Sequence, residues 1–230
     1  MKRSKQTSHI ESRSNLGKQS AEISEQTRQK MVLTALSRFA VSGFDEVSLR
    51  DIADAAGTSH GLIRHHFGTK ELIWRAAVDF AVDQHSTTLT TLLTVSPSEP
   101  EDPVRTAQHV LYNFLKVSAQ QPEIIRMILH EGTEGGERLD YILERFTPIG
   151  ELMKRLFEQV QSQGYLQQFD NQTFFLHLLL AGAAPLALTA LSGWLVKVNP
   201  ASTTFFEMHV QQFITTLLGT PGSIQAQMEI

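Results

Sequence analysis

Residues 48–67, SLRDIADAAGTSHGLIRHHF, decide the fold of the first part of the chain, because they have the pattern of two short helices separated by a turn. Ser48 can cap the first helix, and Asp51 three residues later completes a capping box. The helix then runs to Ala56 with one apolar face, formed by Leu49, Ile52, Ala53 and Ala56. Gly57 ends it, since glycine adopts the left-handed conformation without strain from a Cβ atom. This pattern predicts a helix-turn-helix.

The second helix of this motif has an apolar face and a basic face. Thr58 or Ser59 can cap it, and Ile63 and Phe67, four residues apart, share the face that packs on the first helix. The outward face then carries an arginine, two histidines and a small glycine: His60, Gly61, Arg64 and His65. Such a face suits the major groove of DNA. The alternative is a solvated basic face on an ordinary bundle helix, because plain helix pairs have the same geometry.

The helices around the motif are expected from the same kind of pattern. A first helix is predicted from Thr27 to Val41, with Gly43 as its stop signal. Thr69 can cap a fourth helix that continues past Gln84 toward Thr94, long enough to link the motif to the rest of the chain. Lys70 in its first turn lies beside free backbone N–H groups, which together would bind a phosphate.

The stretch from about Thr27 to Gln84 resembles the DNA-binding domain of the TetR/AcrR family of bacterial repressors. The matching features are the TRQ opening, the helix end from Phe39 to Phe44, the motif core and the start of the fourth helix: Ser48, Arg50, Ile52, Ala53, Ala56, Gly57, Gly61, Phe67, Lys70 and Glu71. One position departs from the family, because Arg64 stands where a tyrosine usually contacts phosphate. The predicted DNA-contacting residues are Ser48, Arg50, Ser59, His60, Gly61, Arg64, His65, His66 and Lys70.

Composition and charge agree with a DNA-binding segment on an acidic remainder. Residues 1–75 contain twelve Lys and Arg against eight Asp and Glu, whereas residues 76–230 contain eight against sixteen. The chain has no cysteine, which excludes disulfides, thiolate catalysis and cysteine-ligated metals and is compatible with the cytoplasm. Residues 1–24 are rich in Ser, Gln, Lys and Arg and are predicted to be a disordered basic arm rather than a signal peptide.

The remaining chain is predicted to be entirely helical. The proline-rich stretch 96–103, SPSEPEDP, separates two helical patterns. One helix follows from Val104 to Leu115, a second opens at Pro122 and ends at Gly132, and a third runs from Leu139 to Val160 with a kink at Pro148. The family resemblance implies that residues 25–85 bind DNA and that residues 86–230 bind an effector and form the dimer.

The last two helices are the predicted dimer interface. Phe174 to Val196 is nearly continuous apolar sequence, but its proline, two glycines and polar residues favour a buried helix over a membrane span. A helix that is apolar all round needs cover on every side, which a partner subunit can supply. Asn199 is expected to cap a final helix. In the family these two helices, here about 171–196 and 200–218, pair with their two-fold mates in a four-helix bundle.

Polar residues inside the apolar stripes are the candidate effector ligands, and each has the alternative of an ordinary core or helix-contact role. They are His109, Tyr112, Asn113, Arg126, His130, Tyr141, His177 and Trp194. No metal or cofactor is expected, because the string from His130 to Glu134 lacks a second histidine and contains a helix-breaking glycine. The neighbours His65 and His66 should point in different directions.

These patterns together predict an all-α, homodimeric, cytoplasmic transcription regulator. A helix-turn-helix domain would bind a palindromic double-stranded operator, and a small-molecule effector would release it by preferring the other state of the dimer. The chain is not expected to be an enzyme. Two alternatives stay open: an architectural DNA binder without a ligand, and a helical enzyme or ligand carrier whose basic segment is incidental.

Overall fold

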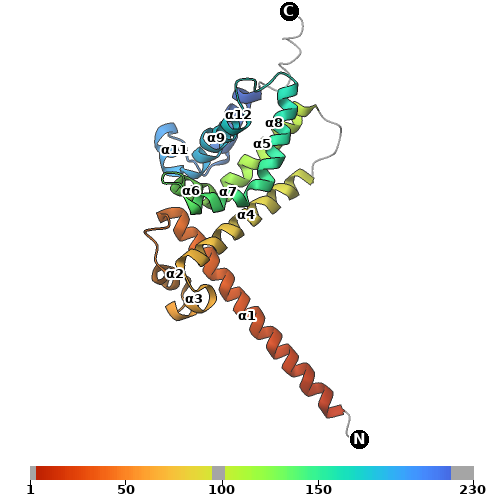
Figure 1. Cartoon of the computed structure of the whole chain (residues 1–230), viewed down its shortest axis with the longest axis vertical. Coiled ribbons are helices and arrows are strands. Elements are labelled where there is room, and N and C mark those ends of the chain that lie inside the picture. The colour runs from red at the N-terminus through yellow and green to blue at the C-terminus, as the bar shows by residue number, and fades with distance from the viewer. Residues whose placement is uncertain (1–3, 95–101, 219–230) are drawn as a thin grey trace, which may run out of the picture. The chain divides into compact units, whose positions relative to one another are not determined.

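The computed structural model describes residues 4–94 and 102–218, and all regular structure in these residues is helical, which confirms the predicted all-α fold (Figure 1). The chain divides into two compact units, Met1–Ala77 and Val78–Ile230, here called the amino-terminal and carboxy-terminal units. The division falls inside helix α4 (Lys70–Thr94), earlier along this helix than the boundary expected after residue 85. Most of the proline-rich stretch lies outside the described residues.

The amino-terminal unit contains α1 (Ser4–Ser42), α2 (Leu49–Ala56), α3 (His60–Phe67) and the first part of α4. Helix α2 packs against α1 and α3, and Ile52 and Ile63 are both completely buried. An aromatic cluster completes this core, in which the Phe44 ring stacks on Phe39 and meets Trp74 edge to face. The predicted helix-turn-helix and its apolar core are therefore present.

Helix α1 is longer than the sequence pattern indicated. The expected helix from Thr27 to Val41 forms its last part, but α1 begins at Ser4, so the prediction of a disordered arm over residues 1–24 is wrong for residues 4–24. These residues contain no proline and only one glycine, so nothing in them interrupts a helix that extends from an already folded turn. An apolar stripe marks the face of a helix that is buried against other elements. A helix that extends into solvent does not need such a stripe.

The carboxy-terminal unit begins with the latter part of α4 and continues with α5 (Pro103–Gln120), α6 (Glu123–Glu131), α7 (Glu137–Arg145) and α8 (Thr147–Ser162). It ends with α9 (Asn171–His177), the π-helical segment η1 (Leu178–Ala183), α10 (Ala184–Ala187), α11 (Thr189–Val196) and α12 (Thr203–Leu218). Helix α5 is central, because it contacts α8, η1, α10 and α12 (Figure 1). Gly182 of η1 allows this packing, since a Cβ atom there would lie 3.1 Å from side-chain atoms of Leu115 and Phe213.

The predicted helix from Leu139 to Val160 is two helices rather than one kinked helix. Helix α7 ends at Arg145, and α8 starts at Thr147 with Pro148 in its first turn. Proline lacks the N–H that a continuing helix would use, whereas the N–H groups of a first turn have no partner in any case. The proline therefore begins a new helix.

The apolar stretch from Asn171 to Val196 is also divided. Its two parts, Asn171–Ala187 and Thr189–Val196, meet at an 85° bend. Two side chains bind carbonyls just before the bend: Ser192 donates to the Pro185 carbonyl (2.7 Å) and Arg126 donates to the Ala187 carbonyl (2.9 Å). Among the described residues, no single helix has the length and apolar composition of a membrane span, and this bent pair meets those two criteria only when taken together.

The final helix starts later than predicted. The Ser202 hydroxyl accepts from the Phe205 N–H (3.2 Å) at the start of α12, whereas Asn199 accepts from Ala201 in the preceding turn. Phe205, Phe213 and Leu217 are buried within the unit, so much of the apolar face of α12 is covered by its own chain.

Candidate nucleic-acid interface and effector cavity

The amino end of α2 is fixed by a capping box between Ser48 and Asp51. The Ser48 hydroxyl accepts from the Asp51 N–H (3.2 Å) and donates to the Asp51 carboxylate (2.6 Å), which also accepts from the Ser48 N–H (2.9 Å). The predicted cap is therefore present. Its hydroxyl proton is already donated within the protein.

The turn between α2 and α3 depends on Gly57 and Ser59. Gly57 has a φ of +63°, and the Thr58 N–H donates to the Ala53 carbonyl (3.0 Å), which closes the end of α2. Ser59, and not Thr58, caps α3, because its hydroxyl accepts from the Leu62 N–H (3.2 Å). Both serines predicted to contact DNA thus also determine where the two helices begin.

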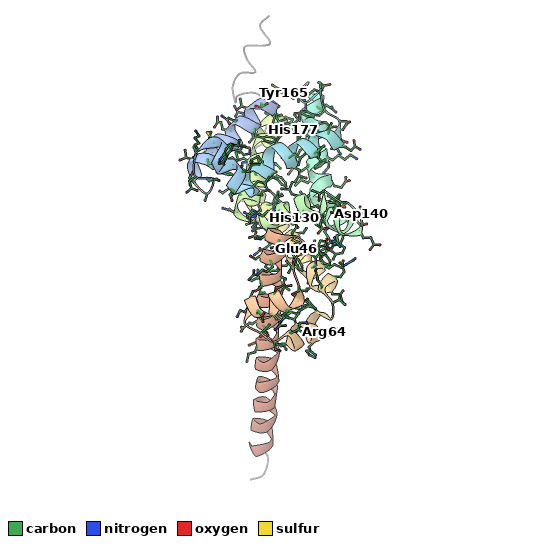
Figure 2. The ribbon with its side chains drawn as sticks, turned by 90° about the vertical axis from the view of Figure 1, so that its left-hand side faces the viewer. Glu46, Arg64, His130, Asp140, Tyr165 and His177 are labelled. Atoms are coloured by element: carbon green, nitrogen blue, oxygen red, sulfur yellow. The ribbon has the colours of Figure 1, made fainter. Side chains whose placement is uncertain are left out.

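The outward face of α3 is accessible. His60, Gly61, Arg64 and His65 are exposed, Arg64 can be followed in Figure 2, and Arg50 on α2 is exposed as well. A Cβ atom at Gly61 would find its nearest neighbour, the Ser59 hydroxyl oxygen, at 3.9 Å, so the fold has room for a side chain there. The fold itself does not require glycine at this position. A glycine on an exposed basic helix is what close approach of a DNA backbone would require.

Lys70 and His66, both predicted to contact DNA, are half-buried rather than fully exposed. Lys70 is half-buried, and its ammonium group donates to the Asp45 carbonyl (3.2 Å) and lies 4.3 Å from the centre of the Phe44 ring. This geometry holds the lysine over the loop before α2, although an ammonium group retains further N–H donors. The rings of His65 and His66 meet edge to face at 5.6 Å rather than pointing apart, and His66 is half-buried.

The carboxy-terminal unit contains a cavity of about 700 Å³, lined by residues from α5 to η1. Its walls are almost wholly apolar, with contributions from Phe114, Ile128, Leu139, Leu143, Phe146, Met153, Phe175 and Leu179. Segment η1 provides Leu178, Leu179 and Leu180. Cavities of this size and character bind small molecules in many proteins.

None of the eight predicted effector ligands lines this cavity. Several bind other parts of the protein instead: Asn113 donates to the His109 carbonyl (2.9 Å), Tyr112 to the Glu207 carboxylate (2.9 Å) and Arg126 to the Ala187 carbonyl. The His177 ring stacks on Phe213. His130 and Trp194 are exposed, and His130 and His177 are labelled in Figure 2. The structure therefore does not bring these residues together around this cavity. Tyr112 and Arg126 bind acceptors on other helices, whereas Asn113 binds a carbonyl of its own helix.

Tyr141, the remaining predicted ligand, belongs to a polar cluster between α4 and α7. Its hydroxyl donates to the Asp79 carboxylate (2.8 Å), which also pairs with the Arg145 guanidinium (2.8 Å). Arg145 reaches Asp83 as well (3.2 Å). Because Leu139 and Leu143 of the same helix line the cavity, α7 connects the cavity wall to α4.

His85 is a feature that the sequence pattern did not reveal. It is completely buried in α4, and its ring meets those of Phe114 and Phe146 edge to face at 5.5 and 6.0 Å. Neither ring nitrogen has a hydrogen-bond partner among the described residues. Burial lowers the pKa of His85 from 6.5 to about 4, so the ring is neutral at pH 7.

An apolar surface extends along α11 and the segment before it. Leu188, Leu191, Trp194, Leu195 and Val196 are exposed, Trp194 by 77%. A groove of about 400 Å³ lies along this surface, between α10, α11 and α12. Exposed apolar residues that cluster in this way mark a contact surface more often than a solvated one.

Comparison with known proteins shows which family the amino-terminal unit resembles. A model described as "Bacterial regulatory proteins, tetR family" matches residues 33–77. The chain is 46% identical over 50 residues to the HTH-type transcriptional regulatory protein RaaS of Mycobacterium tuberculosis, covering 22% of this chain and 23% of that protein. It is 46% identical over 44 residues to the probable acrEF/envCD operon repressor of Escherichia coli K12, covering 19% and 20%. The match thus spans less than a quarter of these relatives.

The fold extends this similarity over most of the chain. The structure of AibR in complex with isovaleryl coenzyme A and operator DNA aligns with a TM-score of 0.63 at 16% identity, covering 85% of this chain and 100% of that one. At this identity the alignment establishes the fold alone. Together with the family model, it confirms the resemblance on which the sequence interpretation rested, and the matched proteins are described as regulators rather than enzymes.

Proposed function

The chain carries the DNA-binding domain of the tetR family of bacterial regulatory proteins, and from this premise we propose that it is a ligand-responsive transcription regulator acting in the cytoplasm. Its activity is repression: a dimer binds a palindromic operator and is released by a small-molecule effector. The observation that carries the proposal is the exposed face of α3, with Arg64, His60 and His65 around a glycine that the fold does not need.

The dimer in this proposal forms through the apolar surface of α11 and the adjoining groove. A second copy of the chain is the expected occupant, because a helix-turn-helix domain reads a palindromic site with two copies related by a two-fold axis. This interface is smaller than the one predicted from sequence, which comprised about residues 171–196 and 200–218. Residues 188–196 carry most of it, whereas Phe205 and Phe213 of α12 pack inside their own subunit.

The effector in this proposal occupies the cavity of the carboxy-terminal unit. AibR, which shares the fold, binds both isovaleryl coenzyme A and operator DNA in its crystal structure, and this supports a pairing of the two functions here. Coupling can follow the contacts of α7, whose Leu139 and Leu143 line the cavity and whose Tyr141 and Arg145 hold Asp79 and Asp83 of α4. Helix α4 is continuous from Lys70, directly after α3, to Thr94.

A gel shift against the DNA that flanks the chain's own gene tests the proposal. Binding should be specific over competitor DNA, should weaken steeply with salt, and should be weaker in Arg64→Ala. Failure to bind this DNA, combined with binding of a small molecule, would favour the ligand carrier. DNA binding that no cavity ligand changes would favour the architectural protein.

A further inference from the structure

The lining of the effector cavity carries no charged side chain. Among the described residues that form it, Thr133 and Thr147 alone have a polar side-chain atom, and the rest are aliphatic, aromatic, methionine or glycine. An ion that binds against such a lining loses part of its hydration and gains no partner from the lining, which costs free energy. The lining therefore selects against charge in the part of a ligand that it encloses.

The arginines nearest in sequence to the lining are already bound to protein acceptors. Arg126 donates to the Ala187 carbonyl, Arg138 pairs with the buried carboxylate of Glu131 (2.8 Å), and Arg145 pairs with Asp79 and Asp83. Recruiting any of them to an anionic ligand would break the bond that it now makes to the protein. These cations thus provide no ready counter-charge for a carboxylate or phosphate.

One buried polar group adjoins the wall and has no hydrogen-bond partner within residues 4–94 and 102–218. The rings of Phe114 and Phe146 line the cavity, and His85 contacts both of them from α4. Buried polar groups are nearly always hydrogen-bonded in folded proteins, so an unpaired one next to a ligand cavity calls for a reason. A neutral imidazole offers one donor and one acceptor.

We infer that the effector is a neutral, largely apolar molecule with a single hydrogen-bonding group, and that His85 pairs with this group at the Phe114 and Phe146 wall. The inference rests on the proposed function, because it names the chemistry of that function's effector. His85 lies behind the Phe114 and Phe146 rings rather than in the lining, so this pairing requires the two phenyl rings to move aside. A hydroxyl or carbonyl suits them, since each can pair with an imidazole without bringing a charge.

The ligand class is tested with probes that share one body and differ in one group. Equilibrium dialysis with radiolabelled probes gives the affinity of the protein for 1-decanol, decanoate, decylammonium and 1-bromodecane. The measurement is made at about pH 8, where the carboxylate and the amine are both charged. Decanol should bind about 100-fold more tightly than either ion. Decanoate or decylammonium binding as tightly as decanol, or no binding of decanol, would overturn the neutral class.

The role of His85 is tested with the two neutral probes. His85→Leu should lower decanol affinity about tenfold and leave bromodecane affinity unchanged, because only decanol offers a hydrogen bond. His85→Asn, which keeps a donor and an acceptor, should retain the preference for decanol even if the leucine variant folds poorly. The matched control is His130→Leu, an exposed histidine of α6 that should change neither affinity. An unchanged decanol preference in folded His85→Leu would remove His85 from the site.

The location is tested at Gly150, which lines the cavity on α8. A Cβ atom there would meet no atom within 4 Å, so a large side chain enters open space. Gly150→Phe should abolish decanol binding while Gly150→Ala retains it, and decanol binding that survives in Gly150→Phe would place the ligand elsewhere. Both variants should still shift the flanking DNA. If the wild-type protein binds decanol but not the flanking DNA, the proposed regulator function is refuted and the inferred ligand class is retained. If it binds the DNA but not decanol, the ligand class is refuted and the regulator function is retained.

Discussion

Ser48 and Asp51 bind each other across the first turn of α2, with the serine hydroxyl 2.6 Å from the carboxylate oxygen. This bond and the one from the Ser48 N–H hold the pKa of the Asp51 carboxyl below its ordinary value. A carboxyl with a lowered pKa in the folded state stabilises that state above its ordinary pKa and loses this effect as the pH falls through the folded value. The capping box is therefore intact at neutral pH.

Because the Ser48 hydroxyl proton is used within this box, we expect Ser48→Ala to act on stability more than on DNA affinity. Loss of the cap should lower the free energy of unfolding by about 1 kcal/mol. Urea unfolding measures this, and fluorescence anisotropy with operator DNA at a temperature where both proteins are folded measures affinity. An affinity loss of about tenfold or more in the folded variant would show a phosphate contact at Ser48 instead.

Gly61→Ala should separate the needs of the fold from those of DNA binding. The site has room for a Cβ atom, and alanine favours a helix over glycine by about 0.5 to 1 kcal/mol, so the variant should be as stable as the wild type or more stable. Its operator affinity should fall, because the methyl group occupies the space through which DNA approaches α3. A variant with unchanged affinity would show that DNA does not reach this part of the helix.

Arg64 stands where the family usually has a tyrosine, and we expect it to read a base. A guanidinium group can pair with the O6 and N7 atoms of guanine, so Arg64→Ala should cost about 1–3 kcal/mol and relax preference at one base pair. Binding to a library of operator variants measures both effects. Arg50→Ala is the control, since the family resemblance places a base contact there. If Arg64→Ala weakens all sequences alike, the side chain binds phosphate.

The exposed apolar residues of α11 should control dimerisation. Leu191→Glu and Trp194→Glu replace exposed side chains, so they should give folded monomers that have lost operator binding. Phe213→Glu is the contrast, because Phe213 is buried and a carboxylate there should cost about 3 kcal/mol or more in stability. Light scattering and thermal unfolding distinguish the two results. A dimeric Leu191→Glu variant would move the interface away from α11.

His85 should make the protein sensitive to mild acid. Its pKa of about 4 lies below the ordinary 6.5, so between these values the unfolded chain binds a proton that the folded chain excludes. Stability is therefore complete above about pH 6.5, falls as the pH drops, and the loss attributable to His85 approaches about 3 kcal/mol near pH 4. Urea unfolding at several pH values, compared with His85→Phe, isolates this contribution. Parallel pH profiles of the two proteins would contradict it.

The sequence alone determined the helix-turn-helix, because its signals are local. Ser48, Asp51, Gly57 and Ser59 act within one or two turns of their own helices, and the spacing of Ile52 and Ile63 identifies the buried faces without knowledge of any distant partner. Once the buried face of α3 is known, the remaining face, which includes Arg64 and Gly61, must point outward. The family resemblance depends on these same residues.

Only the tertiary structure decided where the cavity lies and which residues border it. Tyr112, Arg126 and Tyr141 were predicted as ligands because they are polar residues in apolar helical stripes. Each instead binds a group distant in sequence: Tyr112 binds Glu207, Arg126 binds the Ala187 carbonyl and Tyr141 binds Asp79. Cavity-lining leucines and phenylalanines look identical in sequence to those that pack in a core, because the difference is whether an opposing helix fills the space. His85 is likewise an ordinary residue of α4 until Phe114 and Phe146 enclose it. Local chemistry fixes a cap or a turn, whereas a cavity is a property of several helices at once.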